Sequence, residues 1–160
     1  NNPNKKSLRE GGLFCFSSHE RVYLRAMQTK RVLILFGLAA LAAVVFVLNY
    51  IAGLYYLFWV FWWYDVMMHF ITGAAVGGFA AWGILRFRPN IPPRTLFWMV
   101  FAAIMVVGIG WEIFEYMNGM YVGETRIVFD TVCDLILDTL GALLATTLIR
   151  HALRDTTHIV

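Results

Sequence analysis

The chain has 160 residues, of which 60% are hydrophobic and only 14% are charged. Soluble proteins are typically about 45–50% apolar and about 25% charged, and a small domain leaves much of its surface exposed to water. The composition therefore argues against a soluble globular enzyme, a disordered chain and a coiled coil. The two cysteines are too few for a disulfide scaffold. The net charge of +3 does not point to a nucleic-acid partner, because the basic residues flank the apolar runs, as in membrane proteins.

Four apolar stretches are long enough to cross a bilayer, which takes about 20 residues. They predict an all-α polytopic membrane protein with four transmembrane helices, at about residues 32–51, 65–85, 95–117 and 127–149. Residues 52–64, after the first span, are rich in Trp, Tyr and Phe, which is typical of a membrane–water interface. We interpret them as the end of that span followed by an interfacial turn or short helix, with Gly53 as the break point.

The basic residues predict the orientation of the spans. Twelve of the 13 Lys and Arg residues precede the first span, lie between the second and third, or follow the fourth. With four spans these regions share one side, which the positive-inside rule makes cytoplasmic. We therefore expect a multi-pass protein of the bacterial inner membrane with both termini in the cytoplasm. Its parts are a basic N-terminal segment, a transmembrane domain and a cytoplasmic tail, at residues 1–30, 31–150 and 151–160.

The N-terminal segment lacks the apolar run of a cleavable signal peptide. Residues 19–30 form either a basic helix that lies against anionic lipid or part of a disordered basic tail. Met27 is a candidate natural start, so whether residues 1–26 belong to the native protein stays open.

Six of the ten acidic residues lie within the spans or at their rims, where a carboxylate is costly: Asp65, Glu112, Glu115, Asp130, Asp134 and Asp138. The up-and-down order of the spans places all six, together with His69, in the outer half of the membrane. Spacings of three and four residues place the polar side chains of each span on one face of its helix. Small residues such as Gly73 and Gly141 continue these faces and allow close helix approach, so we expect the polar faces to meet inside the bundle.

So many acidic groups cannot all be ionised in a dry pocket; either several are protonated, or water or a cation lies among them. Carboxylates with one imidazole suit a divalent ion such as Mg, Mn, Fe(II) or Zn. The sequence thus predicts a metal site with candidate ligands Asp65, His69, Glu112, Glu115, Asp134 and Asp138. Glu112 or Asp138 could also act as general base, which makes these two the candidate catalytic residues.

Structural explanations compete with this prediction. Asp65 could simply cap the second span, and Asp130 could pair with Arg126 or complement the helix dipole. His69 alone would be an ordinary buried histidine. The remaining acidic residues could form a protonated hydrogen-bond network that locks the packing of the helices.

The same residues carry a family resemblance. Asp65 with His69 and Phe70, then Glu112 with Glu115, then Arg126, and finally Asp134, Asp138 and Gly141 follow one another along the last three spans. This order resembles VanZ-like membrane proteins and, more closely, the related YjdF-like bacterial membrane proteins. The VanZ-like pattern has Gln at position 115 and Asn at position 138, so this site is more acidic, which argues against carrying over glycopeptide resistance. The resemblance covers about residues 60–145 and implies a fold and a membrane location but no reaction.

Three functions remain open from the sequence. The first is an envelope enzyme, a metal-assisted hydrolase or transferase that acts on a lipid-linked or cell-wall substrate. The second is a non-enzymatic protein, as a homo-oligomer, that binds or transports a cation, a proton or a cationic small molecule. The third is a structural membrane subunit whose acidic residues serve packing. In all three, the lipid bilayer is the immediate partner.

Overall fold

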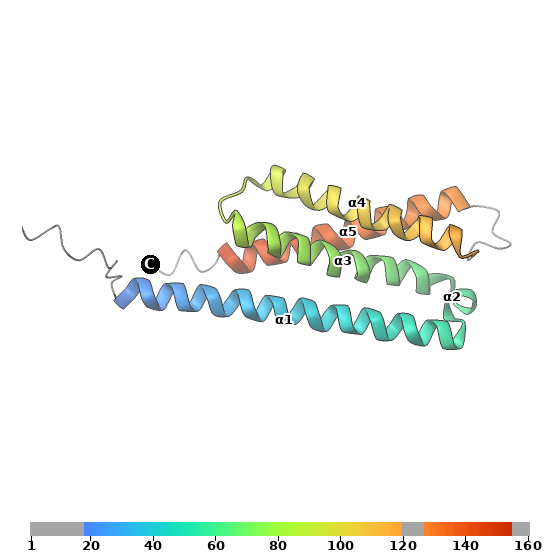
Figure 1. Ribbon diagram of the computed structural model, residues 1–160, viewed down its shortest axis with the longest axis horizontal. Coiled ribbons are helices and arrows are strands. Elements are labelled where there is room, and N and C mark those ends of the chain that lie inside the picture. The colour runs from blue at the N-terminus through green and yellow to red at the C-terminus, as the bar shows by residue number, and fades with distance from the viewer. Residues whose placement is uncertain (1–17, 120–126, 155–160) are drawn as a thin grey trace, which may run out of the picture.

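A computed structural model describes residues 18–119 and 127–154 of the chain. These residues form the helices α1 (Ser18–Tyr55), α2 (Leu57–Val60), α3 (Trp62–Phe87), α4 (Pro93–Met117) and α5 (Ile127–Arg154). All but the short α2 are long and apolar enough to cross a membrane. The predicted all-α fold with four spanning helices is therefore confirmed. The start of α1, the α3–α4 connection and the end of α5 lie at the same end of the bundle (Figure 1).

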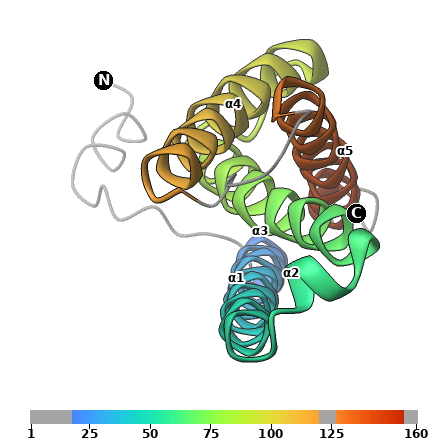
Figure 2. The same cartoon turned by 90° about the vertical axis from the view of Figure 1, so that its right-hand side faces the viewer.

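Helix α3 lies at the centre, with α1, α4 and α5 arranged around it (Figure 2). Its most extensive contact is with α5. Glycines bring the two backbones together: a Cβ at Gly73 would overlap the backbone of Asp138, and a Cβ at Gly141 would overlap the backbone carbonyl of Phe70. The prediction that Gly73 and Gly141 lie at a close helix contact is confirmed.

Helix α1 packs along α3 and is attached to it by two side-chain hydrogen bonds. Trp82 Nε1 donates to the carbonyl of Arg31 at 3.0 Å, and the Tyr64 hydroxyl donates to the carbonyl of Leu48 at 2.9 Å. Residues 19–30 belong to α1, so they are helical rather than an irregular tail. Only 6% of the residues in the most apolar stretch of α1 are buried within the bundle, as suits a helix that faces lipid.

The chain turns at Tyr56, not at Gly53. Helix α1 continues through Gly53 to its end, and Tyr56 adopts a left-handed backbone conformation with φ 57°. Helix α2 follows directly and exposes Trp59. The short helix predicted in this aromatic segment is present, but the predicted break point was wrong, because a glycine inside a helix costs only about 1 kcal/mol.

The main apolar core and the buried ionisable residues occupy different parts of the bundle. The buried apolar core lies toward the α3–α4 connection and includes Ala81, Leu85, Leu96, Val100, Ile104, Ala142 and Ile149. The buried ionisable residues gather toward the opposite end, near α2, and are His69, Glu112, Asp134 and Asp138. A smaller apolar cluster of Ala52, Tyr64 and Met68 packs α1 against α3 at the same end, so the candidate site lies next to apolar packing.

Candidate metal site

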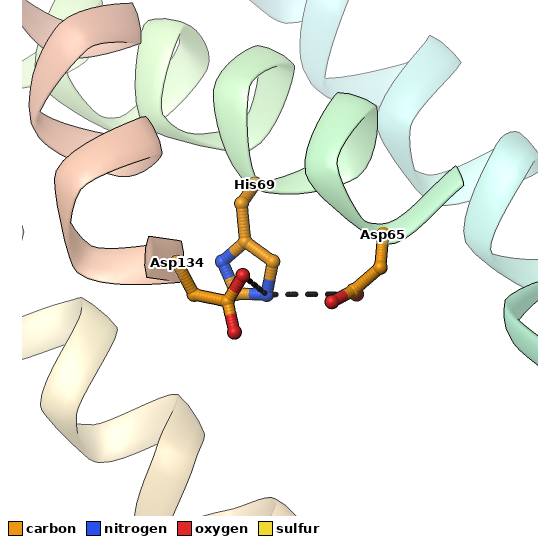
Figure 3. Close-up of side chains that lie close together, drawn as sticks. All are labelled: Asp65, His69 and Asp134. Atoms are coloured by element: carbon orange, nitrogen blue, oxygen red, sulfur yellow. Dashed lines mark ion pairs between the residues drawn. The ribbon is translucent and has the colours of Figure 1, made fainter. Parts of the chain in front are cut away.

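Helices α3 and α5 bring Asp65, His69 and Asp134 together (Figure 3). Asp65 and His69 are one turn apart on α3, and Asp134 faces them from α5. His69 Nε2 lies 3.7 Å from Asp65 Oδ1 and 3.9 Å from Asp134 Oδ1. The N-cap of α3 is Phe61, so Asp65 is a residue of the first turn and not the cap that one structural explanation required. Its carboxylate instead offers one of three potential ligand atoms, which all lie within 4.8 Å of one another.

The spacing of these atoms suits a cation better than direct hydrogen bonds. Both distances from His69 Nε2 exceed the range of about 2.7–3.2 Å that N–H···O bonds occupy. Two ligands that each bind a metal at about 2.0–2.2 Å lie about 3–3.6 Å apart, so small side-chain shifts would close the group around an ion. One imidazole and two carboxylates form a donor set that fits Zn, Fe(II), Mn or Mg. Three protein ligands also leave coordination positions for water or substrate.

Asp138 approaches the other nitrogen of the same ring. Its Oδ1 lies 3.5 Å from His69 Nδ1, and its side chain is buried. Histidines that bind a metal usually donate their second N–H to a carboxylate or carbonyl, which fixes the orientation of the ring. The geometry therefore favours a role for Asp138 in orienting His69. Its role as a metal ligand stays a prediction.

Glu112 is buried on α4 beside this group. Its Oε2 accepts a hydrogen bond of 2.7 Å from Thr131 Oγ1 on α5. Thr131 precedes Asp134 by three residues, so the two share one face of α5. Glu112 is thus held next to the cluster, outside the set of ligand atoms within 4.8 Å.

Two other acidic residues also lie outside that set. Glu115 Oε1 accepts a hydrogen bond of 2.8 Å from Trp111 Nε1, one turn earlier on α4. Asp130 is half-buried in the first turn of α5, where it can complement the helix dipole. Arg126, its predicted partner, lies outside the described residues.

A cavity of about 510 Å³ adjoins the site between α1, α3 and α4. Helices α1 and α4 both pack on α3, but in the described ranges no Cα atom of one lies within 8 Å of a Cα atom of the other, which leaves this space between them. Asp65, His69 and Asp138 line one part of it, and most of the remaining lining is apolar, for example Phe46 and Ile104. This size and this division into polar and apolar parts are typical of small-molecule sites.

Sequence reasoning missed two contributions to the site. Helix α1 supplies Asn49 and Tyr50 to the cavity, although we expected no site residue from the first span. Asn49 interrupts an otherwise apolar run, which is the signal that could have identified it. The hydrogen bond from Thr131 to Glu112 was also missed, because a threonine in a membrane helix more often bonds to its own backbone.

Residues 21–155 match the protein family described as "Predicted membrane protein (DUF2238)". No curated protein and no solved structure matches the chain. The family match extends over all four spanning helices and includes every residue of the candidate site. The chain therefore belongs to this DUF2238 family of membrane proteins.

Proposed function

We propose that this protein is a metal-dependent enzyme of the bacterial cell envelope that hydrolyses or transfers a group on a lipid-linked substrate. One observation carries the proposal: Asp65, His69 and Asp134 offer three ligand atoms within 4.8 Å beside a largely apolar cavity. The cavity suits the hydrocarbon chain of a lipid-linked molecule, and the ligand group suits its phosphoryl or carbonyl head.

Each residue of the site has a separate role in this proposal. A divalent cation bound there would polarise a substrate oxygen and activate a water. Asp65 and Asp134 would hold it as negative ligands, and His69 would be a neutral ligand through Nε2. Asp138 Oδ1 lies 3.5 Å from Nδ1, and a small side-chain shift would let it accept the Nδ1–H and orient the ring. Glu112, which accepts a hydrogen bond from a threonine of α5, and Asp138, which lines the cavity, are the two candidates for the general base.

We place the protein in the inner membrane with both termini in the cytoplasm. Support comes from the basic residues, 12 of 13 of which flank the spans on one side. In that orientation the cluster lies in the outer half of the bilayer, where envelope lipids would reach it. The resemblance to VanZ-like and YjdF-like proteins agrees with an envelope role.

A second candidate is a non-enzymatic protein, oligomeric in the membrane, that binds or transports a cation or a cationic small molecule. It is favoured by the acidic residues that line the cavity, Asp65, Glu115 and Asp138, which would attract a positive head group without any metal. The two candidates differ in whether a divalent ion or an organic cation stabilises the protein.

Thermal unfolding of the purified chain in detergent tests the proposal. We expect a chelator to lower the Tm and a divalent ion to restore it, since a ligand at 100 times its Kd stabilises the folded state by about 2.7 kcal/mol. His69→Ala should lose this response, whereas Asp130→Asn should keep it, because Asp130 lies outside the ligand group. A wild type that ignores divalent ions but is stabilised by organic cations would favour the second candidate instead.

A further inference from the structure

A second polar cavity lies at the other end of the bundle, far from the candidate metal site. It has a volume of about 460 Å³, and its lining residues come mainly from α1, the α3–α4 connection and the end of α5. These three segments lie at the same end of the bundle (Figure 1). Three arginines line it: Arg31 from α1, and Arg150 and Arg154 from α5. None of the described residues that line it is acidic. We call this cavity the anion pocket.

Among the described residues, two of these guanidinium groups have a buried donor without an acceptor. Arg31 Nε and Arg150 Nη1 are both buried, and neither has a hydrogen-bond partner among the described residues. Arg150 Nη2 makes one long contact, 3.4 Å, to the carbonyl of Ile91. A buried donor without an acceptor costs about 1–3 kcal/mol, and more when it is charged. The pocket therefore holds positive charge and free hydrogen-bond donors, and an anion with several acceptor oxygens would satisfy both.

The chemistry of the pocket and its position near the membrane surface favour the phosphate of a lipid as its ligand. The planar fork of arginine matches phosphate oxygens in geometry and charge. Arg31 directly precedes the apolar run 32–51, so it lies where hydrocarbon meets the head groups. Basic pockets between membrane helices are known to bind anionic lipid head groups. Apolar lining residues such as Met27 and Leu153 suit the glycerol and the first methylenes of such a lipid.

We propose that the anion pocket binds the phosphate of an anionic phospholipid, which bridges Arg31 on α1 to Arg150 on α5. These two helices otherwise contact each other little. The hydrogen bond from Trp82 Nε1 to the Arg31 carbonyl already ties that turn of α1 to α3. A bound phosphate thus completes the attachment of α1 to the rest of the bundle.

Thermal unfolding of the full chain in an uncharged detergent tests this binding. The probes are phosphatidylglycerol, phosphatidylcholine and inorganic phosphate, each titrated into the detergent solution. We expect phosphatidylglycerol to raise the Tm of the wild type by several degrees and the other two to leave it unchanged. Arg31→Gln and Arg150→Gln should each weaken the apparent affinity for phosphatidylglycerol at least about tenfold, which corresponds to about 1.4 kcal/mol.

The matched controls are Arg86→Gln and Arg88→Gln, because both arginines are exposed at the same end of the bundle and neither lines the pocket. They should respond to phosphatidylglycerol as the wild type does. If Arg150→Gln does not fold, Arg150→Lys, which keeps the charge and loses the fork, should show the same weakening. An equal response in all variants, no response in the wild type, or stabilisation by inorganic phosphate alone would overturn the proposal.

Discussion

At the scale of single residues, His69 connects the two parts of the candidate site. Its Nε2 faces Asp65 and Asp134, and its Nδ1 faces Asp138. If Nε2 binds the metal, Asp138 fixes which way the ring points without touching the ion. Removal of Asp138 should therefore lower the metal affinity only in part, whereas removal of His69 should abolish metal binding.

This difference can be measured as metal affinity. We expect Asp138→Asn to lower the affinity about 10–100-fold, the usual cost of losing a residue that orients a ligand. His69→Ala should leave no measurable binding, and Asp130→Asn should bind as the wild type does. Affinity should also fall in acid, because protons compete for the ligand atoms. Isothermal titration with Zn or Mn checks all three variants, and equal losses in Asp138→Asn and Asp130→Asn would refute the orienting role.

At the scale of helices, the α3–α5 contact determines where the ligands lie. Gly73 on α3 touches the backbone of Asp138, and Gly141 on α5 touches the backbone of Phe70. A side chain at either glycine would push the helices apart and increase the separation of His69 and Asp134. The small residues thus serve the site as well as the packing.

The comparison of two glycines on α3 tests this role. A Cβ at Gly73 would overlap the backbone of Asp138, whereas a Cβ at Gly83 has no atom within 4 Å. Gly73→Ala should therefore destabilise the protein, typically by about 1–3 kcal/mol for an overpacked site. Gly83→Ala should leave stability unchanged or raise it by about 0.5–1 kcal/mol, since alanine favours a helix. Thermal unfolding in detergent distinguishes them, and the same Tm change in both variants would refute the close contact.

At the scale of the whole molecule, the bundle separates its charges. The acidic cluster lies in the half near α2, and the arginines of the anion pocket lie at the opposite end with the α3–α4 connection. This distribution agrees with the positive-inside rule if the basic end faces the cytoplasm. The proposed metal chemistry and the proposed lipid bridge would then act at opposite faces of the membrane.

Reporter fusions test that orientation. Alkaline phosphatase, which works only outside the cytoplasm, should be inactive when fused after Val160 and active when inserted between Asn118 and Ile127. A fluorescent protein that matures in the cytoplasm should give the reverse pattern. Phosphatase activity after Val160 would place the acidic cluster on the cytoplasmic side and contradict an envelope substrate.

The periodicity of the sequence was enough to predict part of the site. Spacing by four residues put Asp65 and His69 on one face, and the order of the spans put Asp134 opposite them. Periodicity locates a face only to a broad stripe, about 100° wide. Which ring nitrogen meets Asp138, and which hydroxyl meets Glu112, depends on how each helix rotates about its axis. That rotation follows from close packing, which the pattern of polar residues does not contain.

The metal content of the purified protein tests the central proposal most directly. After incubation with Zn, Mn, Fe(II) or Mg and removal of free ions, elemental analysis should find about one divalent ion per wild-type chain and almost none in His69→Ala. Asp130→Asn, purified in parallel, should retain the full content. A wild type that holds no divalent ion under any of these conditions, or a His69→Ala variant that holds as much as the wild type, would contradict a metal site at Asp65, His69 and Asp134.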